Sequence, residues 1–326
     1  MQNANKNLKL LEFPLQVKFY AISFALMAFA TCKLLANSWN NRLDYSFGYL
    51  TPIFVLYILF DRYPKISSTF SEHAMPESTK LLKPFCDFFF GSMLILGCLV
   101  FLAFSLIFAN TMNWGVPTFA MTFGFVFASF AMTYFSSTEN VYGEKIDIKT
   151  RLKYVSLFIF PCFIWLISAP LFTAIEDKIS LFLLSKVAAI TVSIMETLGF
   201  IVELKGNTIS FPKGTVGVAD ACSGIRSLTA CLFAGSFLAA ALLNKVWKKI
   251  ALVGLSMCFA FLFNLVRALF LSFWAYENGS ESISGTVHDA AGYFVLGMTV
   301  VGLLIFTSLF NINPVPKEFR NEEKNK

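Results

Sequence analysis

Apolar stretches follow one another along most of the chain and are separated by short polar connections. Several are longer than the roughly 18 residues that a helix needs to cross a bilayer. Charged and turn-forming residues mark the breaks, for example Asp61-Arg62-Tyr63-Pro64 and the connection from Asn110 to Gly115. The pattern predicts an all-α polytopic membrane protein with about eight spanning helices. They are expected near residues 19–36, 45–60, 85–108, 115–135, 154–173, 227–243, 250–275 and 289–311.

One long connection, from Thr173 to Ser227, departs from this alternation of spans and short loops. Its first part, Ile179 to Leu198, is apolar but broken by polar residues, which is typical of a helix lying in the membrane interface. Period-two alternation follows and predicts a small β element outside the membrane. Its strands are expected at residues 201–204, 208–211 and 215–218.

Lys and Arg residues gather in every second connection, and this distribution sets the orientation because cytoplasmic loops carry the positive charge. Both termini are therefore predicted to be cytoplasmic. A ninth span at residues 179–198 would invert everything after it and place Lys245, Lys248 and Lys249 outside. The basic connections contain Lys6, Lys9, Lys18, Arg62, Lys65, Lys80, Lys83, Lys145, Lys149, Arg151, Lys153, Lys245, Lys248, Lys249, Lys317 and Arg320.

The first apolar stretch follows three lysines and ends at Cys32, as in some cleaved signal peptides. Thr31 is a poor residue directly before such a cysteine, so we interpret this stretch as the first helix. The cytoplasmic connection 61–83 and the end of the chain are polar, and we expect no regular structure there and assign no role to 61–83.

These elements predict one integral membrane domain that extends over residues 1–326. Its parts are a five-helix part (1–173), an extracytoplasmic loop (174–226), a three-helix catalytic part (227–312) and a cytoplasmic tail (313–326).

Composition supports a membrane protein, because 56% of the residues are hydrophobic and 14% are charged, against about 25% charged in soluble domains. The net charge of +6 does not indicate a nucleic-acid partner, since the Lys and Arg residues lie mostly in short loops. With two histidines and no Cys-x-x-Cys pair, neither a metal nor another cofactor is expected.

Cys222 stands out as a candidate nucleophile. It lies at the expected outer start of the sixth helix, where unpaired backbone N–H groups and the positive helix end favour a thiolate. Arg226, one turn further on, adds a positive charge on nearly the same face. The plainer alternative is a buried structural thiol.

Arg267 and His288 are expected on the same outer face as Cys222. Arg267 lies in Asn264-Leu265-Val266-Arg267, inside an apolar helix, where a permanent cation is costly and marks function. His288 begins the last helix, and Asp289 is a weak candidate to orient its ring, because neighbouring helix residues point about 100° apart. The alternatives are an arginine that snorkels to lipid headgroups and a histidine on a polar surface.

Three motifs occur in order along the second half of the chain: Ala221-Cys222-Ser223-Gly224-Ile225-Arg226-Ser227, Asn264-x-x-Arg267 and His288-Asp289-x-x-Gly292. Together with the stretch from Leu198 to Val218, they resemble the exosortase and archaeosortase family of membrane transpeptidases. This specific resemblance covers about a third of the chain. The five preceding helices are similar to the family only in their hydrophobic layout.

The resemblance implies cleavage of a C-terminal sorting signal on exported proteins, consisting of a short motif, a transmembrane helix and a basic tail. Cys222 would form the acyl-enzyme, His288 would act as acid and base, and Arg267 would assist the intermediate. The cleaved protein would pass to a cell-surface acceptor linked to lipid or glycan. The implied location is the cytoplasmic membrane, with the active site outside.

A different class of function stays open on the sequence alone. A transporter or another non-enzymatic membrane protein would use Arg267 and Asp87 to line a polar path. In such a protein Cys222 would be dispensable. A third reading is transfer of another acyl or glycan group. The sequence names neither the substrate motif, the acceptor nor the oligomeric state.

Overall fold

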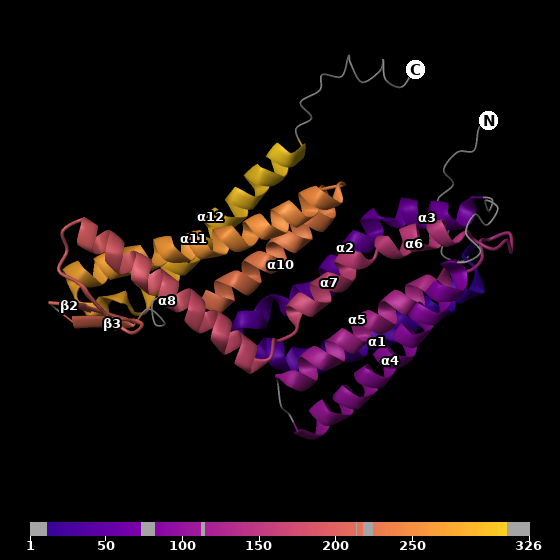
Figure 1. Ribbon diagram of the computed structural model, residues 1–326, viewed down its shortest axis with the longest axis horizontal. Coiled ribbons are helices and arrows are strands. Elements are labelled where there is room, and N and C mark those ends of the chain that lie inside the picture. The colour runs from indigo at the N-terminus through magenta and orange to yellow at the C-terminus, as the bar shows by residue number, and fades with distance from the viewer. Residues whose placement is uncertain (1–11, 73–81, 112–114, 213, 218–223, 312–326) are drawn as a thin grey trace, which may run out of the picture. The chain divides into compact units, whose positions relative to one another are not determined.

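The computed structural model describes residues 12–72, 82–111, 115–212, 214–217 and 224–311. The chain forms two compact units, Met1–Glu176 and Asp177–Lys326, and each is described by itself (Figure 1). The boundary between them falls inside the helix α8 (Thr173–Thr197).

The first unit is made of helices that pack around aromatic and aliphatic side chains. Trp39 and Tyr45 are buried in this core and bond to the end of the last helix: Trp39 Nε1 donates to the Ser168 carbonyl over 2.8 Å, and Tyr45 Oη accepts from the Leu171 amide over 3.1 Å. The elements are α1 (Leu15–Asn41), η2 (Leu43–Leu50), α2 (Thr51–Asp61), α3 (Tyr63–Ser71), α4 (Leu82–Thr111), α5 (Val116–Ser136), α6 (Ile148–Ser156) and α7 (Ile159–Ser168).

The second unit combines the rest of α8, a small sheet and three further helices. The sheet is antiparallel in the order β1-β2-β3, and Ile209 pairs with Val216 on the face that is buried against α8 and α11. The elements are β1 (Glu203–Lys205), β2 (Thr208–Phe211), β3 (Gly214–Gly217), α10 (Gly224–Leu242), α11 (Val246–Asn278), η3 (Ser280–Ile283) and α12 (Thr286–Asn311).

The structure confirms an all-α polytopic membrane fold with a small β element. Among the described residues, seven helices are long and apolar enough to cross a membrane, against the eight expected spans. The expected span at 45–60 is divided into the 3-10 segment η2 and the short α2, and α10 offers only the shorter apolar stretch Ser227–Leu242. By length and composition α8 joins the set.

The connection 61–83 contains a helix, which corrects the expectation that it lacks regular structure. Pro64 stands in the first turn of α3, where its missing N–H costs no hydrogen bond. Phe70 is fully buried and stacks edge-on against Phe13 and Tyr154. The buried Phe70 ring anchors this helix in the first unit although the segment is mostly polar. The sequence pattern reflected only the polar composition.

The fifth predicted span is interrupted between α6 and α7. Pro161 has no N–H, so the carbonyl of Leu157 loses its partner one turn earlier in the helix. The guanidinium of Arg62 donates to this carbonyl instead, and Arg62 is buried. The break is therefore a proline kink whose free carbonyl is hydrogen-bonded, and it gives Arg62 a structural role.

Helices α4 and α5 approach so closely that only glycine fits at their crossing. A Cβ on Gly124 would lie 2.6 Å from the backbone nitrogen of Phe101, and a Cβ on Gly97 would lie 2.6 Å from that of Ala128. Small residues at such crossings let helix backbones meet, which is how helices associate in a bilayer.

Gly124→Ala is expected to destabilise the protein by about 1–3 kcal/mol, because the new methyl group must push two backbones apart. Gly254→Ala is the matched control, since nothing lies within 4 Å of the Cβ position there. Alanine should be neutral or stabilising by up to about 1 kcal/mol at this helical site. Thermal unfolding of both purified variants measures the difference, and equal midpoints would contradict the crossing.

The position of α8 bears on whether it crosses the membrane or lies at its outer surface. Its buried residues Leu184 to Val192 belong to one cluster with Ala268 and Ala275 of α11, and Phe200, just after it, stacks on Tyr276. These partners lie in the last three turns of α11, so the second half of α8 lies beside that end of α11. The alternation of basic connections predicts that both ends of α8 are on the outer side.

Single cysteines placed at Lys178 and Lys205, in a background without reactive native thiols, should both react with a membrane-impermeant maleimide added outside intact cells. The two positions lie at the start of α8 and in β1. Labelling of one position from outside and the other only after permeabilisation would make α8 a crossing helix. A cysteine at Lys248, in the first turn of α11, is the inside control.

Candidate active site

Arg267 lies on the buried face of α11 and is not directed to lipid. Its exposed fraction is 8%, and it continues a stripe that includes Ala260 and Asn264. Measured from Val246, Arg267 is roughly 32 Å along the helix, beyond a hydrocarbon layer of about 30 Å if the helix is upright. The guanidinium therefore sits inside the protein at one end of the span, which excludes the snorkelling interpretation.

The guanidinium of Arg267 contacts His288. The sequence predicted only that the two residues lie on the same face of the membrane. Arg267 Nη2 lies 2.9 Å from His288 Nε2 and 3.3 Å from the His288 carbonyl oxygen. The same Nη2 lies 3.4 Å from His288 Nδ1, so it is within reach of both ring nitrogens. Two helices thus hold a permanent cation against an imidazole.

Nδ1 of His288 also faces Asp289. The distance from Nδ1 to Asp289 Oδ1 is 3.5 Å, at the limit of a hydrogen bond, and the carboxylate is 70% exposed. This contact is weak, as the angle between neighbouring helix residues indicates.

Gly292 lies beside the guanidinium on α12. It is one turn after His288, and a Cβ on it would lie 3.5 Å from Arg267 Nη2, which is an ordinary van der Waals contact. The sequence motif contained this glycine without assigning it a role, and its spacing of four residues from His288 was the available signal.

The other predicted site residues lie on the same helices or outside the described part of the chain. Asn264 is 3% exposed, one turn before Arg267 on the same face of α11. Arg226 is in the first turn of α10, where only the backbone is described. Cys222 lies outside the described residues, in the gap between Gly217 of β3 and Gly224 of α10.

The start of α10 lies level with Arg267, because α10 and α11 run antiparallel in a fixed register. A Cβ on Gly235 would meet the Ser256 side chain at 2.5 Å, so these two residues lie at the same height. Both helices rise by the same amount per residue, so moving 11 residues back along α10 corresponds to moving 11 residues forward along α11. Residue 224 therefore pairs in height with residue 267.

The sheet approaches the same end of α11 from the other side of the gap. Val216 of β3 is buried in one cluster with Ala268 and Ala291, the neighbours of Arg267 and Gly292 in sequence. Gly214, at a φ of 148°, lets β3 approach the Ser280 side chain of η3. The described residues on both sides of the gap thus lie near Arg267 and His288.

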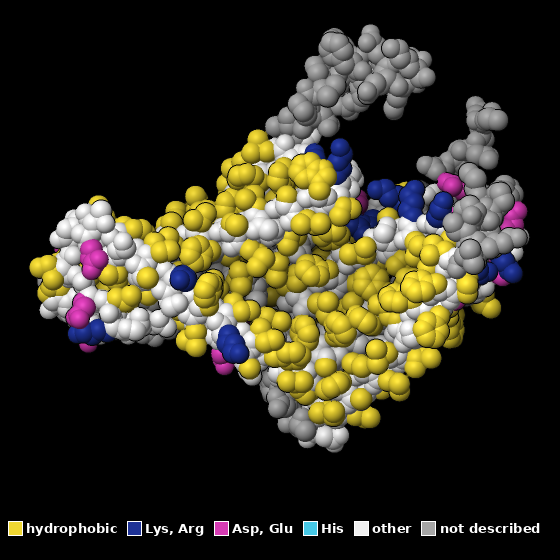
Figure 2. All heavy atoms as spheres, viewed as in Figure 1, with side chains coloured by type: hydrophobic (Ala, Val, Ile, Leu, Met, Phe, Trp, Pro, Cys, Tyr) yellow, Lys and Arg dark blue, Asp and Glu magenta, His cyan; other side chains and the backbone are white. Residues whose placement is uncertain are grey.

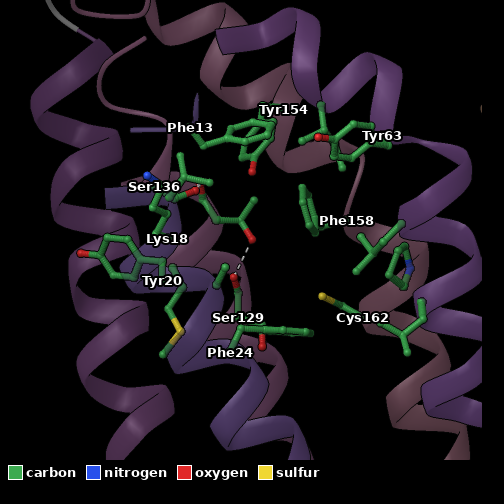
Figure 3. Close-up of a pocket in the computed structure, with 18 of the residues that line it drawn as sticks. Phe13, Lys18, Tyr20, Phe24, Tyr63, Ser129, Ser136, Tyr154, Phe158 and Cys162 are labelled. Atoms are coloured by element: carbon green, nitrogen blue, oxygen red, sulfur yellow. Dashed lines mark hydrogen bonds between the residues drawn. The ribbon is translucent and has the colours of Figure 1, made fainter. Parts of the chain in front are cut away.

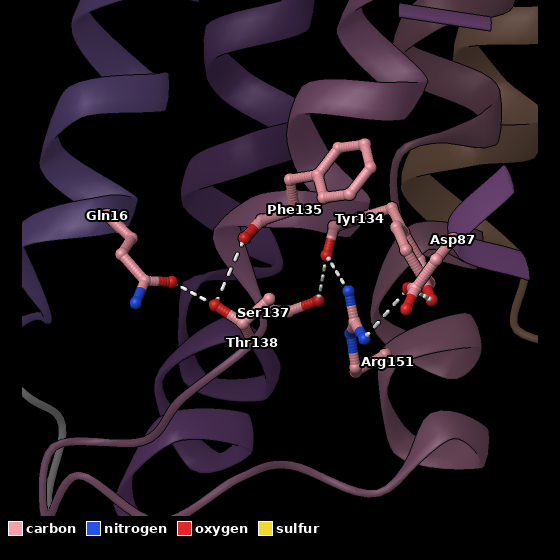
Figure 4. A network of polar contacts seen from close by, with 7 residues as sticks. All are labelled: Gln16, Asp87, Tyr134, Phe135, Ser137, Thr138 and Arg151. Carbon is pink, nitrogen blue, oxygen red and sulfur yellow. Dashed lines mark hydrogen bonds and ion pairs between the residues drawn. The ribbon is translucent and has the colours of Figure 1, made fainter. Parts of the chain in front are cut away.

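Asp87, the second candidate for a polar path, is accounted for by partners in its own unit. Figure 4 shows it with Tyr134 and Arg151: Tyr134 Oη donates to Asp87 Oδ1 over 2.6 Å, and Arg151 Nη1 lies 3.7 Å from the same oxygen. Arg151 Nη2 also donates to the Tyr134 carbonyl over 3.0 Å. This network ties α4, α5 and α6 together, which is a structural role.

A cavity of about 620 Å³ in the first unit is lined mainly by apolar side chains (Figure 3). Phe24 of α1, Tyr63 of α3 and Phe158, just before α7, contribute rings. The hydroxyls of Ser129 and Ser136 bond to carbonyls of their own helix at 2.7 and 2.8 Å. Converging polar groups lie at Arg267 and His288 instead.

The fold and this site define a polytopic membrane protein in which an arginine of α11 contacts a histidine in the first turn of α12. A sequence model described as transmembrane exosortase matches residues 39–305, and the chain belongs to the transmembrane exosortase family. The match contains Cys222, Arg267 and His288, and it extends over most of the first unit, well beyond the motifs that carried the resemblance. Searches of curated proteins and of solved structures found no match.

Proposed function

We propose that the protein is a cysteine transpeptidase that cleaves a C-terminal sorting signal of exported proteins and transfers them to a cell-surface acceptor. The observation that carries this proposal is the 2.9 Å contact between Arg267 Nη2 and His288 Nε2. Membership of the transmembrane exosortase family supports it. So does the register of α10, whose first residue follows Cys222 by two positions and lies level with Arg267.

Cys222 acts as the nucleophile, and His288 removes its proton once Arg267 Nη2 gives up its contact with the ring nitrogen that accepts the proton. The thiolate attacks the scissile carbonyl, and the protonated His288 then donates to the leaving amine, so that an acyl-enzyme forms. Arg267 stabilises the oxyanion: its Nη2 contacts His288, while its buried Nε has no hydrogen-bond partner among the described residues and remains a donor. An acceptor nucleophile, deprotonated by His288, releases the product from Cys222.

Arg226, Asn264 and Asp289 have supporting roles in this proposal. The charge of Arg226 near the start of α10 favours the thiolate. Asn264 lies one turn from Arg267 and offers an amide to the substrate backbone. Asp289 favours the Nδ1–H tautomer of His288 through the 3.5 Å contact.

The proposed site faces outward from the cytoplasmic membrane, with both chain termini in the cytoplasm. The alternating basic connections support this orientation. A reporter fused after Asn278, at the end of α11, should read outside, and one fused after Lys248, at its start, should read inside. The reverse result would overturn the orientation and the extracytoplasmic location of the site.

A trapped acyl-enzyme tests the function directly. The purified protein is mixed with a precursor that carries a C-terminal motif, transmembrane helix and basic tail, and the adduct is analysed by mass spectrometry. The expected result is a hydroxylamine-sensitive thioester on Cys222. An adduct on Cys231 or Cys258, or turnover with no thioester on Cys222, would contradict the proposal.

A further inference from the structure

A wide apolar groove of about 960 Å³ lies in the second unit between α8, α10 and α11, apart from the contact between Arg267 and His288. The lining residues of α8 recur every four positions, at Lys178, Phe182, Lys186 and Ile190, so one face of that helix lines the groove. Met257, Phe261 and other residues of α11 form the opposite wall. None of these lining residues is acidic.

Two lysines give the apolar groove its charge. Lys178 and Lys186 are eight residues apart on α8, and the ammonium of Lys186 lies 5.7 Å from the centre of the Phe182 ring. Figure 2 shows basic side chains over α8 among mostly hydrophobic ones. A lysine ammonium beside an apolar surface is stable only where water or an anion also contacts it.

The groove lies at the depth of the outer half of the bilayer. Its α11 wall runs from Met257 to Asn264, roughly 17 to 27 Å from the start of that helix at Val246. An amphiphile with its chain along this wall would place its headgroup at the outer surface, where α8 carries its ammonium groups.

We propose that this groove is a binding site for an anionic phospholipid, with the headgroup phosphate on Lys178 and Lys186 and an acyl chain between Phe182 and Phe261. Charge complementarity selects the occupant: two cations and no acidic lining residue match a phosphate, and the apolar walls match a hydrocarbon chain. The site is independent of whether Cys222 is a nucleophile. Its outer end at Asn264 lies one turn from Arg267, so a bound lipid borders the candidate active site.

Photolabelling with a lipid probe tests the site. The full chain is placed in phosphatidylcholine nanodiscs that contain phosphatidylglycerol with a diazirine in one acyl chain. After irradiation, labelled peptides are expected from residues 179–190 and 257–264. Each lysine near an anionic headgroup contributes about fivefold in affinity, so Lys178→Gln/Lys186→Gln should weaken phosphatidylglycerol binding about 30-fold.

Three controls make the outcome specific. Lys178→Arg/Lys186→Arg keeps both charges and should keep the labelling, while Lys205→Gln removes an exposed ammonium that pairs with Glu203 on β1 and should change nothing. A phosphatidylcholine probe with the same diazirine should label the groove weakly in every variant. Gel filtration shows that each variant is folded.

Equal labelling by the two lipid probes, or unchanged phosphatidylglycerol labelling in the Gln/Gln variant, would overturn the proposal. A photoreactive transmembrane sorting-signal peptide that labels these residues and excludes the lipid probe would also overturn it and assign the groove to the protein substrate. Because photolabelling needs no turnover, a catalytically inactive Cys222→Ser protein should still label fully. This result separates failure of the lipid site from failure of the transpeptidase.

Discussion

Cys222→Ser is expected to abolish processing of a precursor with a C-terminal sorting signal, with a loss of roughly 10⁴-fold or more in rate. A serine hydroxyl, unlike a thiol, stays protonated without strong activation, so it is a far weaker nucleophile at the same position. The measurement is conversion of the precursor, normalised to the abundance of the membrane-embedded enzyme.

Two other cysteines provide matched controls. Cys231 is 3% exposed in α10, nine residues after Cys222, and Cys258 is exposed in the middle of α11. Cys231→Ser and Cys258→Ser each replace sulfur by oxygen away from the Arg267–His288 pair, so both should process the precursor at nearly the normal rate. Full processing by a well-expressed Cys222→Ser protein would contradict the transpeptidase and favour a transporter.

Hydrophobic length predicted the membrane fold, because each long helix must carry an unbroken apolar segment. It failed where tertiary contacts divide or create helices. The carbonyl of Leu157 is bonded by Arg62, so a kink replaces a straight span, and Phe70 anchors α3 in a connection that reads as polar. Neither partner is close in sequence, so no local pattern carries this information.

The sequence identified Arg267 and His288 as candidate site residues, but it did not predict how their side chains contact each other. Loop charges alone brought Arg267 and His288 to one face, and the structure places their nitrogens 2.9 Å apart. The contact between the two side chains depends on how α11 and α12 cross, and the spacing of residues in the sequence does not give this crossing. The position of Gly292 was missed for the same reason, because its neighbour Arg267 is 25 residues away in sequence.

Arg267→Lys is expected to lower processing by about 10²–10³-fold, although the charge is retained. The planar guanidinium reaches His288 Nε2 and the His288 carbonyl with one nitrogen and keeps Nε as a separate donor. A lysine ammonium concentrates its three donors at one point and cannot hold the imidazole and an oxyanion together. His288→Ala is expected to cost about 10²–10⁴-fold through lost proton transfer.

Chemical rescue separates these roles from a general loss of structure. Added imidazole should restore part of the His288→Ala activity, and added guanidinium should restore part of the activity of Arg267→Ala, while neither additive should help Cys222→Ser. Arg42→Lys is the matched control, because Arg42 pairs with Glu176 over 2.6 Å and a lysine can keep this ion pair. It should leave turnover nearly unchanged. If Arg267→Lys processed the precursor as fast as Arg42→Lys, Arg267 would have no role in the chemistry, and its contact with His288 would be structural.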